Sequence, residues 1–240
     1  MARTRYPKHS GPPPPPLPPA ARTVGQVVAE SLKLYGSRFW WCLLLGLPIA
    51  LADPLSYGRS VTERTVILIA LSPLFTLAYA EACSIEGGAR APRRAWATAL
   101  VVGTLVFVPS AATLGWFALL GVAWLGVLGW VVPVALHEGR GAGASLLRAV
   151  QLARADLVHA IGSIAALVLV FGLTRNALAW LLREQAENTV RASVFLADLV
   201  ISPIVYLGAA IVYRDLVARV GTTRADRLRA REEAMGARAE

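Results

Sequence analysis

The chain has 240 residues, of which 56% are hydrophobic and 16% are charged, and its net charge is +9. About a quarter of the residues in an ordinary soluble domain are charged, so this composition argues against that class. The positive residues lie in the gaps between apolar blocks and form no basic face interleaved with aromatic residues, which argues against nucleic-acid binding. The two cysteines, Cys42 and Cys83, lie within apolar blocks without metal-ligand spacing, so we interpret them as packed hydrophobic thiols.

The chain begins with a basic and then proline-rich stretch, MARTRYPKHSGPPPPPLPPAA. Repeated proline removes amide donors and fixes φ, which favours an extended, mobile conformation. We therefore predict a disordered cytoplasmic arm over residues 1–22. Docking to a proline-binding partner is the alternative to a simple flexible tail.

Two amphipathic helices are predicted outside the membrane-spanning blocks. The first begins after Thr23, because Thr23 and Gln26 have the spacing of a capping box and apolar residues then recur at helical spacing as far as Tyr35. The second is predicted over Ser145–Leu157, where apolar residues again form one stripe. We expect both helices to lie in the headgroup region of a bilayer.

The longest apolar stretch runs from Ala95 to His137 and contains no Asp, Glu, Lys or Arg. One helix of that length would extend roughly 65 Å, about twice the hydrocarbon thickness of a bilayer. Two crossings joined by a turn near Gly115 and Trp116 fit the bilayer better. Applied to the whole chain, this reasoning predicts six crossings, over about 39–54, 65–83, 96–114, 116–136, 160–182 and 192–213.

The sequence therefore predicts an all-α, polytopic membrane protein with six transmembrane helices arranged as three hairpins. The membrane domain is predicted over 23–213, and a basic cytoplasmic tail over 214–240. Lysine and arginine concentrate on the cytoplasmic side of a membrane. Both termini are therefore expected to be cytoplasmic in a plasma (inner) membrane, since the opposite side would hold only Arg59, Arg64, Arg175, Arg183 and Arg191.

Two short loop motifs follow predicted crossings two and four, Glu86-Gly87 and Glu138-Gly139. One interpretation makes each glutamate an acid at a cytoplasmic pore mouth. The other makes it a loop-shaping residue that satisfies exposed amides at the start of the next helix. The second interpretation is the simpler one.

Three stretches carry a resemblance to a known family: LKLYGSRFWWCLLLGLP, PVALHEGRGAGASLLRAVQLARADLVHAIG and ISPIVYLGAAIVYRDLVAR. Together they resemble the membrane domain that accompanies some bacterial glycerophosphoryl diester phosphodiesterases, and stand-alone membrane proteins related to it. Pro133 before Glu138-Gly139, and Pro203 before Tyr213-Arg214-Asp215-Leu216, are the most telling features. The resemblance covers about residues 23–219 and implies a six-helix membrane domain. For the stand-alone members it implies no established activity.

The hydrolase activity of such phosphodiesterases is not expected here. It would require a soluble catalytic barrel with histidines and carboxylates, whereas the chain has only His9, His137 and His159. The sequence also lacks a phosphate-binding loop, a zinc-binding His pair and a nucleophile elbow. No cofactor and no catalytic or metal site are therefore expected.

Three classes of function remain open: a non-enzymatic scaffold or assembly or regulatory factor, a small-solute or lipid transporter, and an intramembrane enzyme. An enzyme would need a nucleophile and a base at one depth, and a transporter a polar cavity near the centre of the membrane. Neither pattern is evident, so the scaffold is the preferred hypothesis. The bilayer is the expected partner, and a protein partner or a second copy of the chain stays open.

Two sets of candidate residues follow from the topology. Arg175 and Asp198 are each about 10 Å below the outer surface on consecutive crossings, which predicts an intramembrane ion pair with Asn176 nearby. The alternative places Arg175 at the interface and Asp198 toward water. The basic tail is expected to contact anionic lipid headgroups at the cytoplasmic face, through Arg214, Arg219, Arg224 and Arg227.

Overall fold

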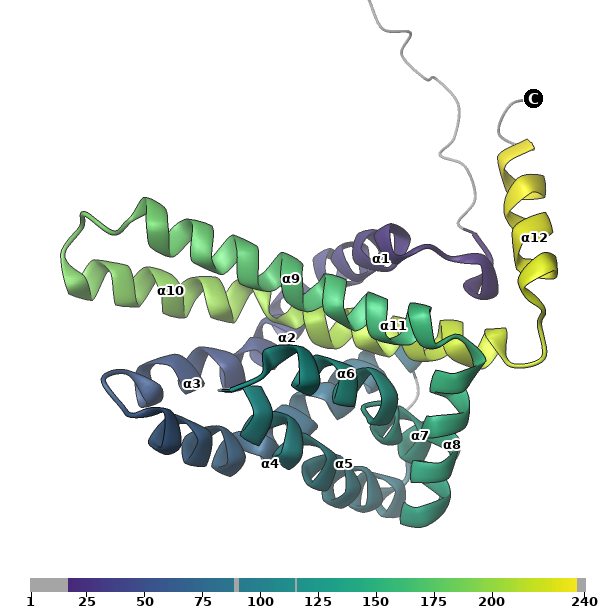
Figure 1. The fold of residues 1–240 in the computed structure, drawn as a ribbon, viewed down its shortest axis with the longest axis horizontal. Helices are drawn as coiled ribbons and strands as arrows, with labels where there is room; N and C mark the ends of the chain where they lie inside the picture. Colours follow the sequence, from purple (N-terminus) through teal and green to yellow (C-terminus); the bar gives the residue numbers. More distant parts are fainter. Residues whose placement is uncertain (1–16, 89–90, 115, 237–240) are drawn as a thin grey trace, which may run out of the picture.

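The computed structural model describes residues 17–88, 91–114 and 116–236, and within them it contains helices and no strand (Figure 1). In chain order the elements are η1 (Pro19–Ala21), α1 (Val24–Ser37), α2 (Phe39–Leu43), η2 (Leu44–Gly46), α3 (Leu47–Ser56), α4 (Val61–Gly87), α5 (Arg93–Leu114), α6 (Ala118–Leu128), α7 (Val131–His137), α8 (Ala142–Ala155), α9 (Leu157–Leu181), α10 (Glu187–Ile201), α11 (Pro203–Arg219) and α12 (Arg224–Gly236).

Six segments in the described part of the chain are long and apolar enough to cross a membrane, which confirms the predicted all-α, multi-pass architecture. Several of them extend beyond the predicted limits, because polar residues continue or cap the helices outside the apolar blocks. Ser60 and Glu63, for example, form a capping box that starts α4 before the predicted position. The six segments are Phe39–Ser56, Val61–Gly87, Arg93–Thr113, Ala118–His137, Leu157–Leu181 and Glu187–Arg219.

Three of these segments are split into two helices, and each second helix has a proline in its first turn. The prolines are Pro48 in α3, Pro133 in α7 and Pro203 in α11. A first-turn residue needs no amide donor for the helix, so proline is tolerated there and would be costly further in. In the split segments α2–α3, α6–α7 and α10–α11, the proline therefore lies where the second helix needs no amide donor.

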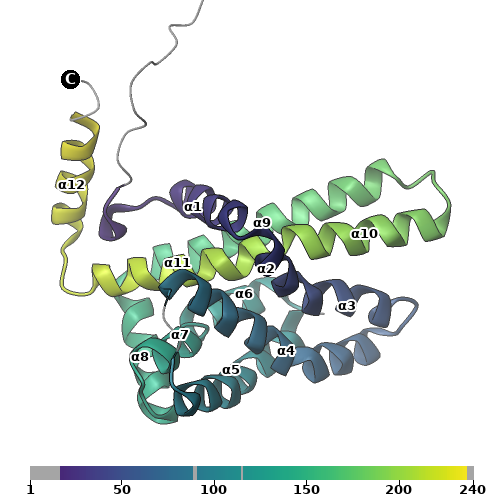
Figure 2. The ribbon, with the colours of Figure 1, turned by 180° about the vertical axis from the view of Figure 1, so that it is seen from behind.

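The spans run side by side between two ends of the molecule (Figures 1 and 2). The loops that join α3 to α4 and α9 to α10 lie at one end, which we call the turn end. The helices α8 and α12 lie at the opposite end, which we call the α8 end. Helix α11 packs against α1, α4, α8 and α9 and is buried along most of its length, so it is the central helix of the bundle.

The two lead-in helices are present as predicted, with small shifts. Helix α1 begins after Thr23 with the predicted capping box to Gln26, and it packs against α9 and α11. Helix α8 covers most of the second predicted amphipathic segment. It ends at Ala155, because Asp156 leaves the helical conformation (φ −157°) and accepts a hydrogen bond at the start of α9.

The packing of the chain extends past both predicted boundaries of the membrane domain. Residues 1–16 of the predicted disordered arm lie outside the described residues, but Leu17 and Ala21 are buried and η1 packs against α11 and α12. The predicted tail begins inside α11, which continues to Arg219 with Leu216 fully buried. The packed part of the chain is therefore longer than predicted at both ends.

Candidate functional site

Three consecutive residues near the end of α11 each contact a different part of the chain. The hydroxyl of Tyr213 donates to Glu138 Oε1 over 3.4 Å, and Arg214 Nη1 donates to Glu86 Oε1 over 2.5 Å. Arg22, which precedes α1, donates from Nη1 to Asp215 Oδ1 over 3.0 Å. Successive helical residues point about 100° apart, so one turn of the central helix can reach three neighbours.

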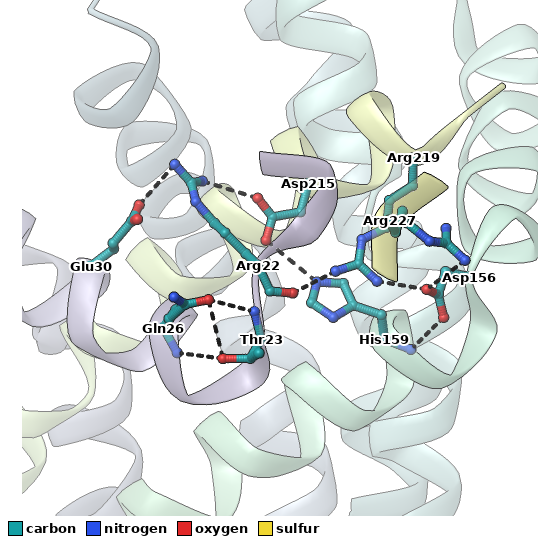
Figure 3. Close-up of polar contacts among 9 residues, drawn as sticks. All are labelled: Arg22, Thr23, Gln26, Glu30, Asp156, His159, Asp215, Arg219 and Arg227. Atoms are coloured by element: carbon teal, nitrogen blue, oxygen red, sulfur yellow. Dashed lines mark hydrogen bonds and ion pairs between the residues drawn. The ribbon is translucent and has the colours of Figure 1, made fainter. Parts of the chain in front are cut away.

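The largest group of charges lies at the α8 end and is shown in Figure 3. We call it the α8-end cluster; its charged and titratable members are Arg22, Glu30, Asp156, His159, Asp215, Arg219 and Arg227. The guanidinium of Arg22 bridges two carboxylates, because Nη2 lies 3.0 Å from Glu30 Oε2 while Nη1 binds Asp215. The segment before α1 is thereby fixed to α11.

Asp156 organises the other half of the cluster. Its Oδ1 accepts a hydrogen bond from the amide of His159 over 3.0 Å and so caps α9. Its Oδ2 accepts from Arg219 Nη1 over 2.6 Å and lies 3.5 Å from Arg227 Nη2. Burial raises the pKa of Asp156, but these hydrogen bonds and the two arginine charges outweigh it and hold the pKa below its ordinary value.

Arg219 joins the two halves of the cluster. Its side chain is only 3% exposed, and its Nη2 donates to the backbone carbonyl of Arg22 over 2.6 Å. The ring of His159 completes the group, with Nε2 3.4 Å from Asp215 Oδ2. Three arginines of the cluster face three carboxylates, so these charges balance one another.

A second cluster lies toward the turn end, where Arg175 on α9 contacts carboxylates from α3 and α10. Arg175 Nε donates to Asp198 Oδ1 over 3.0 Å, and Asp198 is 1% exposed. The structure thus brings Arg175 and Asp198 together as the sequence predicts. Arg175 also donates from Nη2 to Asp53, a partner that the sequence reasoning missed. Asn176 is exposed and lies outside this hydrogen-bonded set.

The Arg175 cluster lines a cavity of about 300 Å³ between α3, α4, α9 and α10. One arginine faces two carboxylates, so the cluster carries a net charge of −1 when both carboxylates are ionised. Arg64, at the start of α4, lines the same cavity and supplies a second positive charge. Arg175 on α9 thereby links α3 and α10 through charged hydrogen bonds.

The loop motifs take part in packing at the α8 end. Glu138 Oε2 accepts from Arg140 over 2.6 Å and Oε1 accepts from Arg148 over 3.3 Å. It therefore does not satisfy amides at the start of α8, whose N-cap Gly141 lacks a side-chain cap. That detail of the prediction is wrong, because nearby arginines compete for the carboxylate.

The glycines of these motifs have two different roles. Gly139 has φ +62°, in the left-handed region that a side chain disfavours. A Cβ on Gly87 would lie 2.6 Å from His137 Cε1, and the His137 ring stacks on Tyr213 with centroids 5.8 Å apart. Gly87 is therefore a position of close approach between α4 and α7.

The expected lipid-headgroup contacts need correction at Arg219, which is buried in the α8-end cluster instead of facing lipid. Arg227 is also largely buried, since its side chain is 14% exposed, and it forms an ion pair with Asp156. Arg214 is 56% exposed but pairs with Glu86. The side chain of Arg224 lies outside the described part of the structure.

Sequence signals for the missed residues were partial. Asp156 follows a helical stripe and precedes an apolar block, which is a recognisable N-cap position. Asp215 and Arg219 are four residues apart on one helix face. Arg22 and Asp53 gave no local signal, because their partners are distant in the sequence.

Among residues 17–88, 91–114 and 116–236, no group of three or more His, Cys, Asp or Glu side chains is placed to share a metal ion. No model of a known protein family matches the chain, and neither a curated protein nor a solved structure is significantly similar to it.

Proposed function

We propose that the protein is a non-enzymatic membrane scaffold whose α8 end presents α12 and the N-terminal segment to a protein partner. The observation that carries this proposal is the α8-end cluster, which ties residues 17–22, α9, α11 and α12 into one unit. Its charges neutralise one another, as expected of a structural element. Helix α12 itself packs little beyond η1 and leaves Leu228 46% exposed.

The orientation belongs to the same proposal. The positive-inside rule favours a cytoplasmic α8 end with both termini in the cytoplasm of a bacterial cell, in its plasma membrane. Reporter fusions at Gly58 and Glu187 are expected to report the outside, and fusions at Gly143 and Arg231 the cytoplasm. A cytoplasmic signal from Glu187 would contradict this orientation.

A photo-crosslinking residue at Leu228 tests the scaffold. In native membranes we expect one discrete adduct from that position. The matched control is Glu184 at the turn end, whose side chain is 83% exposed and which should give no such adduct. Arg227→Gln should weaken the adduct, because it releases α12 from Asp156. Equal labelling at Leu228 and Glu184, or no adduct at Leu228, would refute the proposal.

A small-solute transporter is the second candidate, favoured by the split spans and by the charged cavity around Arg175. Reconstitution into liposomes distinguishes the scaffold from the transporter. A scaffold predicts no solute flux above that of protein-free vesicles. Flux that is lost in Arg175→Gln, with the bundle still folded, would favour transport.

A further inference from the structure

A groove of about 1200 Å³ lies between the α2–α3 segment on one side and the second half of α4 with the start of α5 on the other. Its walls are formed mainly by leucines of η2, α3 and α4, several of which are more than a third exposed. Its volume exceeds that of most small-molecule pockets. The groove therefore offers a wide, mainly apolar surface.

Two arginines line the groove. Arg38 lies at the junction of α1 and α2, and Arg93 is the first residue of α5. Both are exposed, and within the described residues neither lies within 4 Å of a carboxylate. Among the described residues, no carboxylate therefore neutralises the charge of Arg38 or Arg93.

Each arginine is followed three residues later by a tryptophan that also lines the groove, Trp41 after Arg38 and Trp96 after Arg93. Tryptophan rings favour the membrane–water interface. The groove therefore combines two arginine–tryptophan pairs with a wall of leucines. That polarity matches an amphiphile with an anionic head.

We propose that the groove binds one phospholipid from the leaflet at the α8 end, with its phosphate between Arg38 and Arg93 and its acyl chains along the leucines. Guanidinium groups bind phosphate oxygens through charge-assisted hydrogen bonds. Glu81 is the opposing charge in the groove. Glu81 lies on α4, six residues before Gly87, the last residue of that helix, so about 9 Å along the helix axis separate the two residues. Two arginines against one glutamate leave the groove with a net charge of +1, so it selects anionic lipid.

The test titrates phosphatidylglycerol and phosphatidylcholine onto the full-length protein in detergent and counts bound lipid by native mass spectrometry. We expect tighter binding of phosphatidylglycerol. Arg38→Gln and Arg93→Gln should each weaken that binding about tenfold, which corresponds to about 1.4 kcal/mol. Glu81→Gln should strengthen it, because the variant removes the one negative charge among the described residues that line the groove.

Arg94→Gln is the matched control, since Arg94 is exposed on the same turn of α5 but does not line the groove. It should bind phosphatidylglycerol like the wild type. Gel filtration of each variant distinguishes loss of lipid binding from loss of the fold. If one of the two arginine variants fails to fold, the other variant serves as the test. Equal binding of the two lipids, or equal weakening by Arg93→Gln and Arg94→Gln, would overturn the proposal.

Discussion

Replacing Asp215 by Asn tests whether the α8-end cluster holds the bundle to its flanking segments. The side chain of Asp215 is fully buried and lies 3.0 Å from Arg22 Nη1 and 3.4 Å from His159 Nε2. An amide has nearly the same shape as a carboxylate and carries no charge. The substitution therefore removes the ion pair and disturbs little of the packing.

The expected loss of folding stability depends on which ion pairs Arg22 retains in the variant. Removing one partner of a buried ion pair costs about 3–5 kcal/mol, because an uncompensated charge is left behind. Arg22 retains Glu30 at 3.0 Å, so the lower end of this range applies, about 3 kcal/mol. For a chain of this length, 1 kcal/mol shifts Tm by about 2–4 °C, so we expect Asp215→Asn to lower Tm by about 6–12 °C.

The protein carries its own reporters of unfolding, because Cys42 and Cys83 are free and fully buried. A dye that fluoresces on reaction with thiols follows their exposure on heating in detergent. Tryptic cleavage after Arg22 should also accelerate, since that segment loses its anchor. Glu184→Gln, at an exposed site, is the control. A Tm within about 2 °C of that control, with unchanged cleavage, would refute the assigned role of the cluster.

Three further predictions follow. Arg175→Gln should destabilise the protein by about 3 kcal/mol or more, because it leaves the buried carboxylate of Asp198 unpaired, while Asn176→Ala should change Tm by less than about 2 °C. The pKa of Asp156 in the folded protein lies below its ordinary value of 3.8. The ionised carboxylate therefore stabilises the fold above that pH, and this stabilisation is lost as the pH falls through the folded pKa. The Tm difference between wild type and Asp156→Asn should accordingly shrink from pH 6 to pH 3. A Cβ on Gly46 would lie 2.1 Å from the carbonyl oxygen of a residue on α10, whereas a Cβ on Gly25 would meet nothing within 4 Å. Gly46→Ala should therefore lower Tm and Gly25→Ala should not. Equal Tm values for the two variants would contradict the packing of η2 on α10.

The spans could be predicted from the sequence because uninterrupted apolar length is a direct consequence of bilayer thickness. The start of α1 was predicted from its capping box, but the start of α4 was missed, although Ser60 and Glu63 form a similar box there. The splits at Pro133 and Pro203 were also missed. Proline in a sequence does not reveal whether it kinks a helix or starts a new one, and Pro73 lies inside the continuous α4.

The candidate sites were predictable only where the chain itself sets the geometry. Arg175 and Asp198 lie on consecutive antiparallel helices joined by a short loop, so counting residues from the loop placed both at one depth. Asp53 comes from α3, whose position beside α9 and α10 is set by packing. Arg22 and Asp215 are 193 residues apart, and no local pattern joins them.

Helix α1 connects the α8-end cluster to the groove. Its 14 residues span about 21 Å, with Arg22 just before its start and Arg38 just after its end. Arg22 is fixed to α11 through Asp215, while Arg38 lines the lipid groove and has no carboxylate partner within the described residues. A phosphate held by Arg38 would therefore fix α1 at both ends. The position of the N-terminal segment in the proposed scaffold would then depend on the lipid composition of the leaflet at the α8 end.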